Sequence, residues 1–186
     1  LQISFFYIMS DNPAIVNFKH YGISPWEIEV LYELFTKKFE IIQEVIEQTD
    51  ENFVSWLEII LPVQFSEEFF QWFEFKSWEK VKSIIKEMKR RRGSGNAIRV
   101  EIYFIGKPSV RFVVDLKENH DFNGAMEKID YIVELLQYHL SEKDVPKNLT
   151  EIIYKFHIDV GRWMLNTVFA EDKKFIYVEN SWKAIT

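Results

Sequence analysis

Apolar residues recur at helical spacing in several segments of the chain. The first segment begins with Ser-Pro-Trp-Glu, in which the serine and the glutamate can form a capping box and the proline suits the first helical turn. The last segment begins with Asn-Leu-Thr-Glu, which also suits the start of a helix. These patterns predict helices over residues 24–48, 77–92, 121–142 and 148–157.

Strands are indicated where apolar and polar residues alternate, or where a short apolar run is bounded by turn residues. Gly-Lys-Pro-Ser and Ala-Glu-Asp-Lys each lie between two such segments and predict two hairpins. A further apolar run ends at Pro62, and Phe-Phe-Gln-Trp-Phe-Glu-Phe is also expected to form a strand. The predicted strands are residues 53–61, 69–75, 99–105, 110–116, 163–169 and 174–179.

The expected elements follow one order along the chain, a helix and then two strands, three times over. The hairpins imply antiparallel pairing, with the helices laid on one face of the sheet. We therefore expect an α+β fold, with an antiparallel sheet built from hairpins and three to four helices packed on it. Two helices open with Trp-Glu, which is consistent with diverged helix-strand-strand units. Residues 1–186 are expected to form a single domain, and residues 1–9 an edge strand or a leader.

Composition narrows the classes of protein to which the chain can belong. Hydrophobic residues make up 47% of the chain and charged residues 28%, as in globular proteins. The absence of cysteine excludes disulfides and thiolate metal sites, and we expect a cytoplasmic protein. The histidines lack metal-ligand spacing, so neither a metal nor a cofactor is expected. No apolar run approaches the roughly 18 residues of a membrane-spanning helix.

Aromatic residues make up 17% of the chain, and they cluster between residues 65 and 78. On a strand, such a cluster needs burial on both faces, in the core or beneath an apolar ligand or a second subunit. The leading hypothesis is a binding domain that is not an enzyme and that self-associates as a homodimer. The candidate residues for an apolar ligand or an interface are Phe65, Phe69, Phe70, Trp72, Phe73 and Phe75.

A basic segment provides an alternative hypothesis. Residues 76–99 contain nine lysines and arginines against two glutamates, although the chain has a net charge of −6. Its glycines follow a helix and precede a strand, the reverse of the order in a phosphate-binding loop, so we exclude such a loop. Basic residues in a last helical turn also complement the helix dipole without any ligand. The candidate residues for binding an anion or nucleic acid are Lys82, Lys86, Lys89, Arg90, Arg91 and Arg92.

The third hypothesis is an enzyme that uses the carboxylate pair Glu101 and Asp115, with Arg99 or Arg111 holding an anionic substrate. The pairing register of the first hairpin decides whether the two carboxylates meet, because opposed residues share a face. In one register Glu101 lies opposite Asp115, which would raise the pKa of one carboxyl group as in a catalytic dyad. In the other, Arg99 lies opposite Asp115 and Tyr103 lies opposite Arg111. Directly opposed like charges are destabilising, so we expect the second register.

Overall fold

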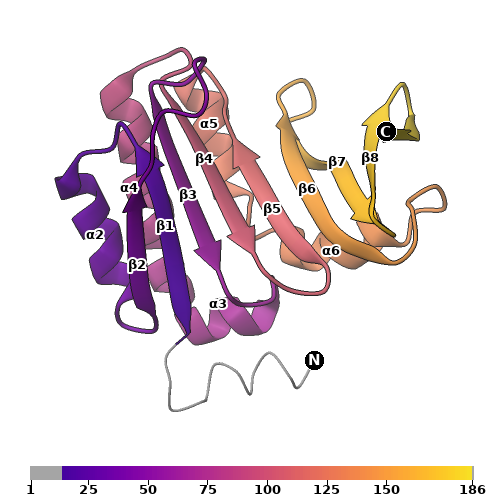
Figure 1. Cartoon of the computed structure of the whole chain (residues 1–186), viewed down its shortest axis with the longest axis horizontal. Coiled ribbons are helices and arrows are strands. Elements are labelled where there is room, and N and C mark those ends of the chain that lie inside the picture. Colours follow the sequence, from indigo (N-terminus) through magenta and orange to yellow (C-terminus); the bar gives the residue numbers. More distant parts are fainter. Residues whose placement is uncertain (1–13, 186) are drawn as a thin grey trace.

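The computed structural model describes residues 14–185, in which nine strands form one continuous sheet (Figure 1). The strands are β1 (Ile15–Tyr21), β2 (Glu40–Val45), β3 (Ser55–Leu61), β4 (Ile98–Phe104), β5 (Ser109–Val114), β6 (Leu149–His157), β7 (Arg162–Ala170), β8 (Lys173–Val178) and β9 (Ser181–Ile185). Their order across the sheet is β2-β1-β3-β4-β5-β6-β7-β8-β9.

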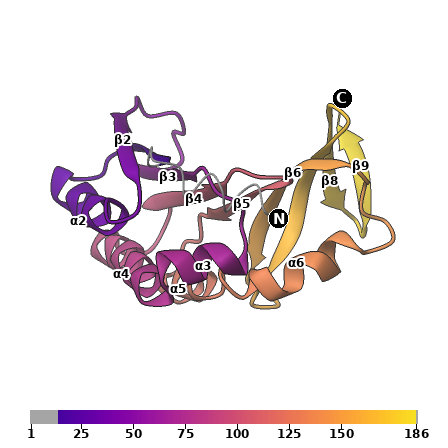
Figure 2. The same ribbon diagram turned by 90° about the horizontal axis from the view of Figure 1, so that it is seen from below.

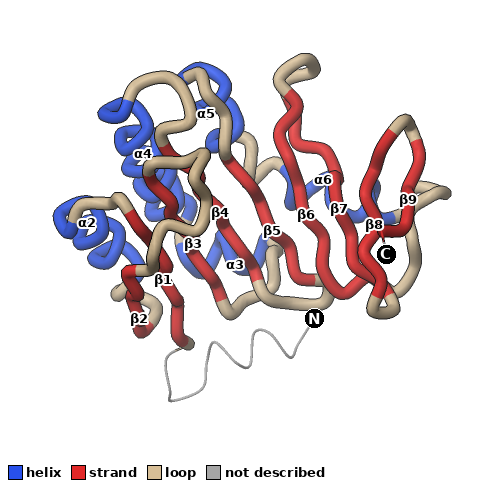
Figure 3. The backbone as a smooth tube through the Cα atoms, turned by 45° about the horizontal axis from the view of Figure 1, so that its top comes forward, coloured by secondary structure: helices blue, strands red, loops and turns tan. Residues whose placement is uncertain are grey.

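Five helices occur in the described part of the chain, and all of them lie on the same side of the sheet (Figure 2). They are α2 (Pro25–Phe35), α3 (Glu67–Phe73), α4 (Phe75–Arg92), α5 (Asn119–Glu127) and α6 (Ile132–Leu140). The hydrophobic core fills the space between these helices and the sheet. We call the opposite surface of β1, β3, β4, β5 and β6 the helix-free face (Figure 3).

The protein has an α+β fold, but the expectation of a purely antiparallel sheet is wrong. The expectation of three to four helices is also wrong, since residues 14–185 form five. β1 and β2, β3 and β4, and β5 and β6 pair in parallel, whereas the remaining neighbours are antiparallel. Each parallel pair is joined by a helical crossover, formed by α2, by α3 with α4, or by α5 with α6. A crossover of this kind returns the chain to the edge from which it left, so the joined strands run the same way.

The predicted hairpins and the helix over residues 77–92 are confirmed as β4–β5, β7–β8 and α4. In β4–β5, Glu101 lies opposite Val113 and Tyr103 lies opposite Arg111, which is the expected register. The buried strand predicted over residues 53–61 is confirmed as β3. Short-range alternation of apolar and polar residues, with a turn between the two strands, is enough to predict the two hairpins.

The helix predicted over residues 24–48 begins as expected but ends at Phe35. The capping box is present: Glu27 N donates to Ser24 Oγ at 3.3 Å, and Ser24 N donates to Glu27 Oε2 at 3.1 Å. Residues 40–45 instead form the edge strand β2, parallel to β1. Isoleucine and valine in this strand favour extended backbone, and their spacing fits a helix equally well.

The helix predicted over residues 148–157 is wrong, because Leu149–His157 is the strand β6. Asn148 does not cap a helix; its φ of 59° places it in the left-handed region, just before the strand. Ile152 and Tyr154 point into the core at a spacing of two residues. This alternation, not the capping sequence, decides the structure of the segment.

Two further predictions need correction. Residues 69–75 are not a strand, since Glu67–Phe73 forms α3, which begins where Phe69 N donates to Ser66 Oγ at 3.2 Å. The helix predicted over residues 121–142 is divided into α5 and α6 by a turn between Glu127 and Ile132. The sequence patterns also missed β1 and β9. The edge strand or leader at residues 1–9 lies outside the described residues.

Candidate functional site

The aromatic cluster of residues 65–78 lies largely in the hydrophobic core. Four of its six candidate residues are almost completely buried: Phe65, Phe69, Phe70 and Phe73. The Phe69 ring packs edge-on against Phe104 of β4, with 5.3 Å between ring centroids. A helix turns most of these rings toward one side, so they need no second covering surface. Among the six, only Trp72 and Phe75 retain appreciable exposed area.

The candidate cation Lys82 is buried in the interface between α4 and α5. Its Nζ lies 2.7 Å from Glu79, 3.0 Å from Asp130 and 3.3 Å from Glu127. Asp130 also accepts a hydrogen bond from Trp78 Nε1 at 3.2 Å. Burial alone would lower the pKa of Lys82, but the carboxylates outweigh it and raise this pKa. Lys82 therefore joins two helices of the fold.

Two more of the basic candidates, Lys89 and Arg92, lie in the last turn of α4. Lys89 is fully buried and donates to the carbonyl groups of Gly95 at 3.1 Å and Lys117 at 2.6 Å. Burial lowers the pKa of Lys89. Arg92 pairs with Glu27 at 2.7 Å and donates to the Gly22 carbonyl at 3.1 Å. These side chains attach the end of α4 to the neighbouring loops.

The remaining basic candidates pair with glutamates at the surface. Lys86 contacts Glu127 across the α4–α5 interface. Arg90 and Arg91 both pair with Glu87, at 2.6 and 3.1 Å. Each of the six basic candidates thus has a carboxylate or carbonyl partner within its own chain. The positive charge read from the sequence is largely neutralised in the folded protein.

The helix-free face contains the charged residues of the predicted enzyme site. Glu101 and Asp115 both lie on this face, but Glu101 is opposite Val113 and the two carboxylates are not opposed. The carboxylate beside Glu101 is instead Glu58, its neighbour across the parallel pair β3–β4. Arg111 Nη1 lies 3.6 Å from Glu58 and 3.7 Å from Glu101.

Arg99 completes this group of charged side chains. It lies 3.5 Å from Glu101 and 3.9 Å from Asp115. The Glu101 side chain is only 7% exposed. Burial raises the pKa of the Glu101 carboxyl group; Arg99 and Arg111 lower it and Glu58 raises it, and the net direction is upward. The sequence identified these residues but not Glu58, because only the strand order places β3 beside β4.

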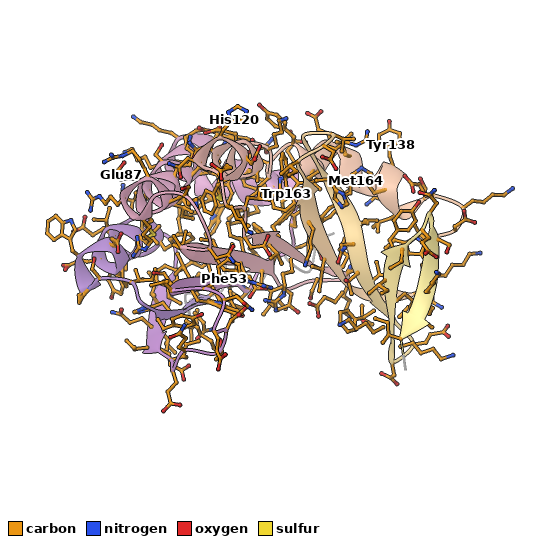
Figure 4. All side chains as sticks on the ribbon, turned by 90° about the horizontal axis from the view of Figure 1, so that it is seen from above. Phe53, Glu87, His120, Tyr138, Trp163 and Met164 are labelled. Carbon is orange, nitrogen blue, oxygen red and sulfur yellow. The ribbon has the colours of Figure 1, made fainter. Side chains whose placement is uncertain are left out.

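A cleft of about 320 Å³ lies between α6 and the strands β7, β8 and β9. Its walls are aromatic and aliphatic, and they include Ile132, Leu135, Trp163, Leu165, Tyr177 and Trp182. Trp163 and Ile132 are buried at its floor, whereas Tyr177 and Trp182 are in contact at its rim, with their rings tilted by 55° and ring centroids 5.3 Å apart. Figure 4 shows Trp163 on the strand that faces α6, and Tyr138 on the outer side of that helix.

Polar groups also line the cleft. They are Lys128, His139, Glu142 and Arg162. His139 Nδ1 forms a 2.8 Å hydrogen bond with the hydroxyl group of Tyr154. Burial lowers the pKa of His139, and Arg162 lowers it further against the opposing effect of Glu142. Lys128 Nζ donates to the Gly161 carbonyl at 2.7 Å. Neither cation of the cleft has an ion-pair partner in residues 14–185, and the Arg162 side chain has no hydrogen-bond partner there either.

Sequence reasoning missed this cleft. Its aromatic residues are spread over β7, β8 and β9, and β9 was not predicted. The available signal was the recurrence of Trp163, Tyr177 and Trp182 in a segment with few other large buried residues. A second, smaller cavity of about 220 Å³ lies between α2 and α4, beside Trp26 and Ile84. The α6 cleft is the larger of the two and falls in the size range of small-molecule sites.

Within residues 14–185, no group of histidine and acidic side chains is placed to hold a metal ion. None of the five helices in residues 14–185 is a candidate for a membrane span. Comparisons with protein-family models, with curated proteins and with solved structures found no match.

Proposed function

We propose that the protein is a binding protein whose α6 cleft holds a small molecule with an aromatic body and an anionic group. The observation that carries this proposal is the cleft itself, about 320 Å³ in volume, with aromatic walls and a few polar groups. Ligand sites in proteins combine apolar walls with a small number of polar groups that fix orientation. This cleft has both features.

The walls favour a flat apolar ligand. Trp163 forms part of the floor and is fixed from behind, because its Nε1 donates to the Ala125 carbonyl at 2.9 Å. Tyr177 and Trp182 lie at the rim, on paired positions of β8 and β9. Aromatic rings bind one another by stacking or edge-on contact at centroid separations of about 4.5–7 Å. A ring-containing ligand could therefore contact the floor and the rim together.

The charge of the lining favours an anionic group. Lys128 and Arg162 are cations, and Glu142 is the one carboxylate among the residues that line the cleft. Burial lowers the pKa of His139, which disfavours a positive charge on this ring. Because Lys128 is already bonded to a carbonyl group, the ligand's anionic group is assigned to Arg162.

A structure determined with 8-anilinonaphthalene-1-sulfonate tests the location of the site. This probe has a fused aromatic body and a sulfonate, so it matches the proposed ligand class. The expected result is electron density for the naphthalene ring beside Trp163, with the sulfonate toward Arg162. Density only in the α2–α4 cavity, beside Trp26, would contradict the proposal.

Self-association is proposed as a second function, and one observation favours it. Tyr131, at the N-cap of α6, and Leu135 and Tyr138 within this helix recur at helical spacing, and their exposed fractions are 58%, 43% and 73%. Tyr131 and Leu135 also line the α6 cleft. An exposed apolar stripe of this kind is a common contact between subunits. Sedimentation velocity should show dimers that a Tyr138→Lys substitution dissociates. A monomer at every concentration would contradict self-association and would leave the α6 cleft unaffected.

A further inference from the structure

The two arginines of the helix-free face are held by unusually long contacts. Arg99 and Arg111 both approach Glu101 Oε1, at 3.5 and 3.7 Å. Their other carboxylate contacts, to Asp115, Glu58 and Glu151, span 3.5 to 3.9 Å. By contrast, Arg92 contacts Glu27 at 2.7 and 2.9 Å in the same molecule. Charge-assisted hydrogen bonds are normally about 2.7–2.9 Å long, so these two guanidinium groups are incompletely paired.

Two buried hydrogen-bond donors on neighbouring residues of this face have no acceptor in residues 14–185. They are Arg99 Nε and Trp56 Nε1. Trp56 and Arg99 are neighbours across the β3–β4 pair, and the guanidinium group lies over the indole ring, 5.1 Å from its centroid. A buried donor without an acceptor is costly, and such groups in folded proteins normally bond to water or a ligand. An oxygen atom would be a suitable acceptor for either donor.

The protonation state of Glu101 determines the balance of charge on the helix-free face, and therefore whether a further anion can bind there. β1 contributes Lys19, β3 Glu58, β4 Arg99, β5 Arg111 and Asp115, and β6 Glu151 and Lys155. With Glu101 ionised, these strands present four cations and four carboxylates. With Glu101 protonated, the cations are in excess. The protonated form also leaves Arg99 and Arg111 without the carboxylate on which they converge.

We propose that the helix-free face binds a small oxyanion, a carboxylate or a phosphate, at Arg99 and Trp56, in competition with Glu101. The oxyanion accepts hydrogen bonds from Arg99 Nε and Trp56 Nε1, two buried donors of this face that lack an acceptor in residues 14–185. Glu101 takes up a proton as the ion binds, because burial and the new negative charge both favour its neutral form. This site lies on the surface of the sheet opposite the helices, and it is separate from the α6 cleft.

The experiment follows the tryptophan indole N–H signals by nuclear magnetic resonance during titration with sodium acetate and, separately, with sodium phosphate, at constant ionic strength. Trp56→Phe identifies the Trp56 signal by its disappearance. The expected result is a saturable shift of that signal, with affinity that falls by at most about tenfold per pH unit above the pKa of Glu101, since one proton is linked to binding. Saturation by acetate alone identifies a carboxylate ligand, and saturation by phosphate alone identifies a phosphate ligand.

Two variants make the test specific. Glu101→Gln keeps the shape of the side chain but removes its charge, so it should bind the ion more tightly at neutral pH and lose the pH dependence. Arg99→Lys keeps the charge but removes Nε, so it should weaken binding. The proposal is overturned if no saturable shift occurs in Glu101→Gln, or if neither variant alters the affinity. A shift confined to Trp163 or Trp182 would also overturn it and would place the anion in the α6 cleft.

Discussion

Arg92, the last residue of α4, and Glu27, in the first turn of α2, form a two-point ion pair. The Nη1–Oε1 distance is 2.7 Å and the Nη2–Oε2 distance is 2.9 Å. Both side chains are largely buried, and Arg92 Nε also donates to Ser55 Oγ of β3 at 3.0 Å. Glu27 at the same time completes the capping box of α2 with Ser24. One pair of side chains therefore fixes the positions of two helices and a strand.

Removal of this ion pair should destabilise the protein. The substitution Glu27→Gln leaves Arg92 buried without its carboxylate, and we expect a loss of roughly 3 kcal/mol in the free energy of unfolding. The Arg92 hydrogen bonds, together with Ser24, hold the pKa of Glu27 at about 2, below its ordinary value of 4.5. The stability from this pair is therefore complete above pH 4.5 and is lost as the pH falls toward 2.

Urea denaturation at pH 7 and at pH 3 measures both effects of Glu27→Gln. The difference between wild type and variant should be smaller at pH 3. The control is Glu87→Gln, because Glu87 also pairs with two arginines but lies at the surface, and it should change stability little. An equal loss for the two variants would contradict a special role for the Arg92–Glu27 pair.

Lys82→Met should also destabilise the fold by roughly 3 kcal/mol, because the substitution removes the cation shared by Glu79, Glu127 and Asp130. Lys80→Met is the matched control, since Lys80 lies two residues away and is exposed. Thermal and urea denaturation of both variants provide the measurement. If Lys82→Met is as stable as Lys80→Met, the α4–α5 interface does not depend on this charge.

We expect buried His20 to lower the free energy of unfolding in mild acid. It is 4% exposed, and neither ring nitrogen has a hydrogen-bond partner in the described residues. Burial lowers its pKa below the ordinary 6.5, so below pH 6.5 the unfolded chain binds a proton that the folded chain does not. Stability should fall as the pH decreases from 6.5 toward the lowered pKa.

His20→Leu should remove the part of this pH dependence that His20 causes. The comparison is the free energy of unfolding at pH 7.5 and pH 5, for wild type and variant. Burial lowers the pKa of His139 in the same direction, so His139→Gln should remove a separate part. An acid loss that is unchanged in His20→Leu would show that His20 is not responsible.

The basic segment should not bind nucleic acid. Its six candidate cations have partners within the chain, and a phosphate backbone would have to compete with them. Fluorescence anisotropy with mixed-sequence oligonucleotides at low salt should show no binding. Binding that weakens steeply with salt, by roughly 0.7–0.9 logarithmic units per phosphate contact, would contradict this expectation.

The sequence predicted the parts of the fold that depend on short-range signals. The hairpin β4–β5 and its register follow from alternation, a turn and the charges of Arg99 and Asp115. The strand β2 could not be recognised, because isoleucines at positions 41 and 42 fit a helical stripe as well as an edge strand. β6 was mistaken for a helix because Asn148 was interpreted as a helix cap. Asn148 instead has a left-handed backbone conformation just before the strand. In both segments, pairing with a distant strand outweighs the local pattern.

The functional surfaces depend still more on long-range order. Glu58 and Glu101 become neighbours only because a crossover through α3 and α4 places β4 beside β3 in parallel. The α6 cleft requires the division of a predicted single helix and the addition of β9. The sequence shows the lysines and arginines of residues 76–99 close together along the chain. Their carboxylate partners, such as Glu27 and Asp130, come from elements that only the tertiary structure brings close.

Fluorescence titration with two matched probes tests whether the α6 cleft binds an anionic aromatic molecule. The probes are 8-anilinonaphthalene-1-sulfonate and N-phenyl-1-naphthylamine, which share an aromatic body but differ in the sulfonate. The cleft-filling variant Leu165→Trp should lose binding of both probes. Arg162→Gln should weaken the sulfonate probe by roughly two- to fivefold, as for an exposed ion pair, and leave the neutral probe unchanged.

Trp26→Ala, in the separate cavity between α2 and α4, is the control and should leave both affinities unchanged. We expect saturable binding of both probes by the wild-type protein, loss of binding in Leu165→Trp at unchanged thermal stability, and weaker binding of the sulfonate probe alone in Arg162→Gln. Binding that survives Leu165→Trp, or that is lost in Trp26→Ala, would contradict the assignment of the α6 cleft as the binding site.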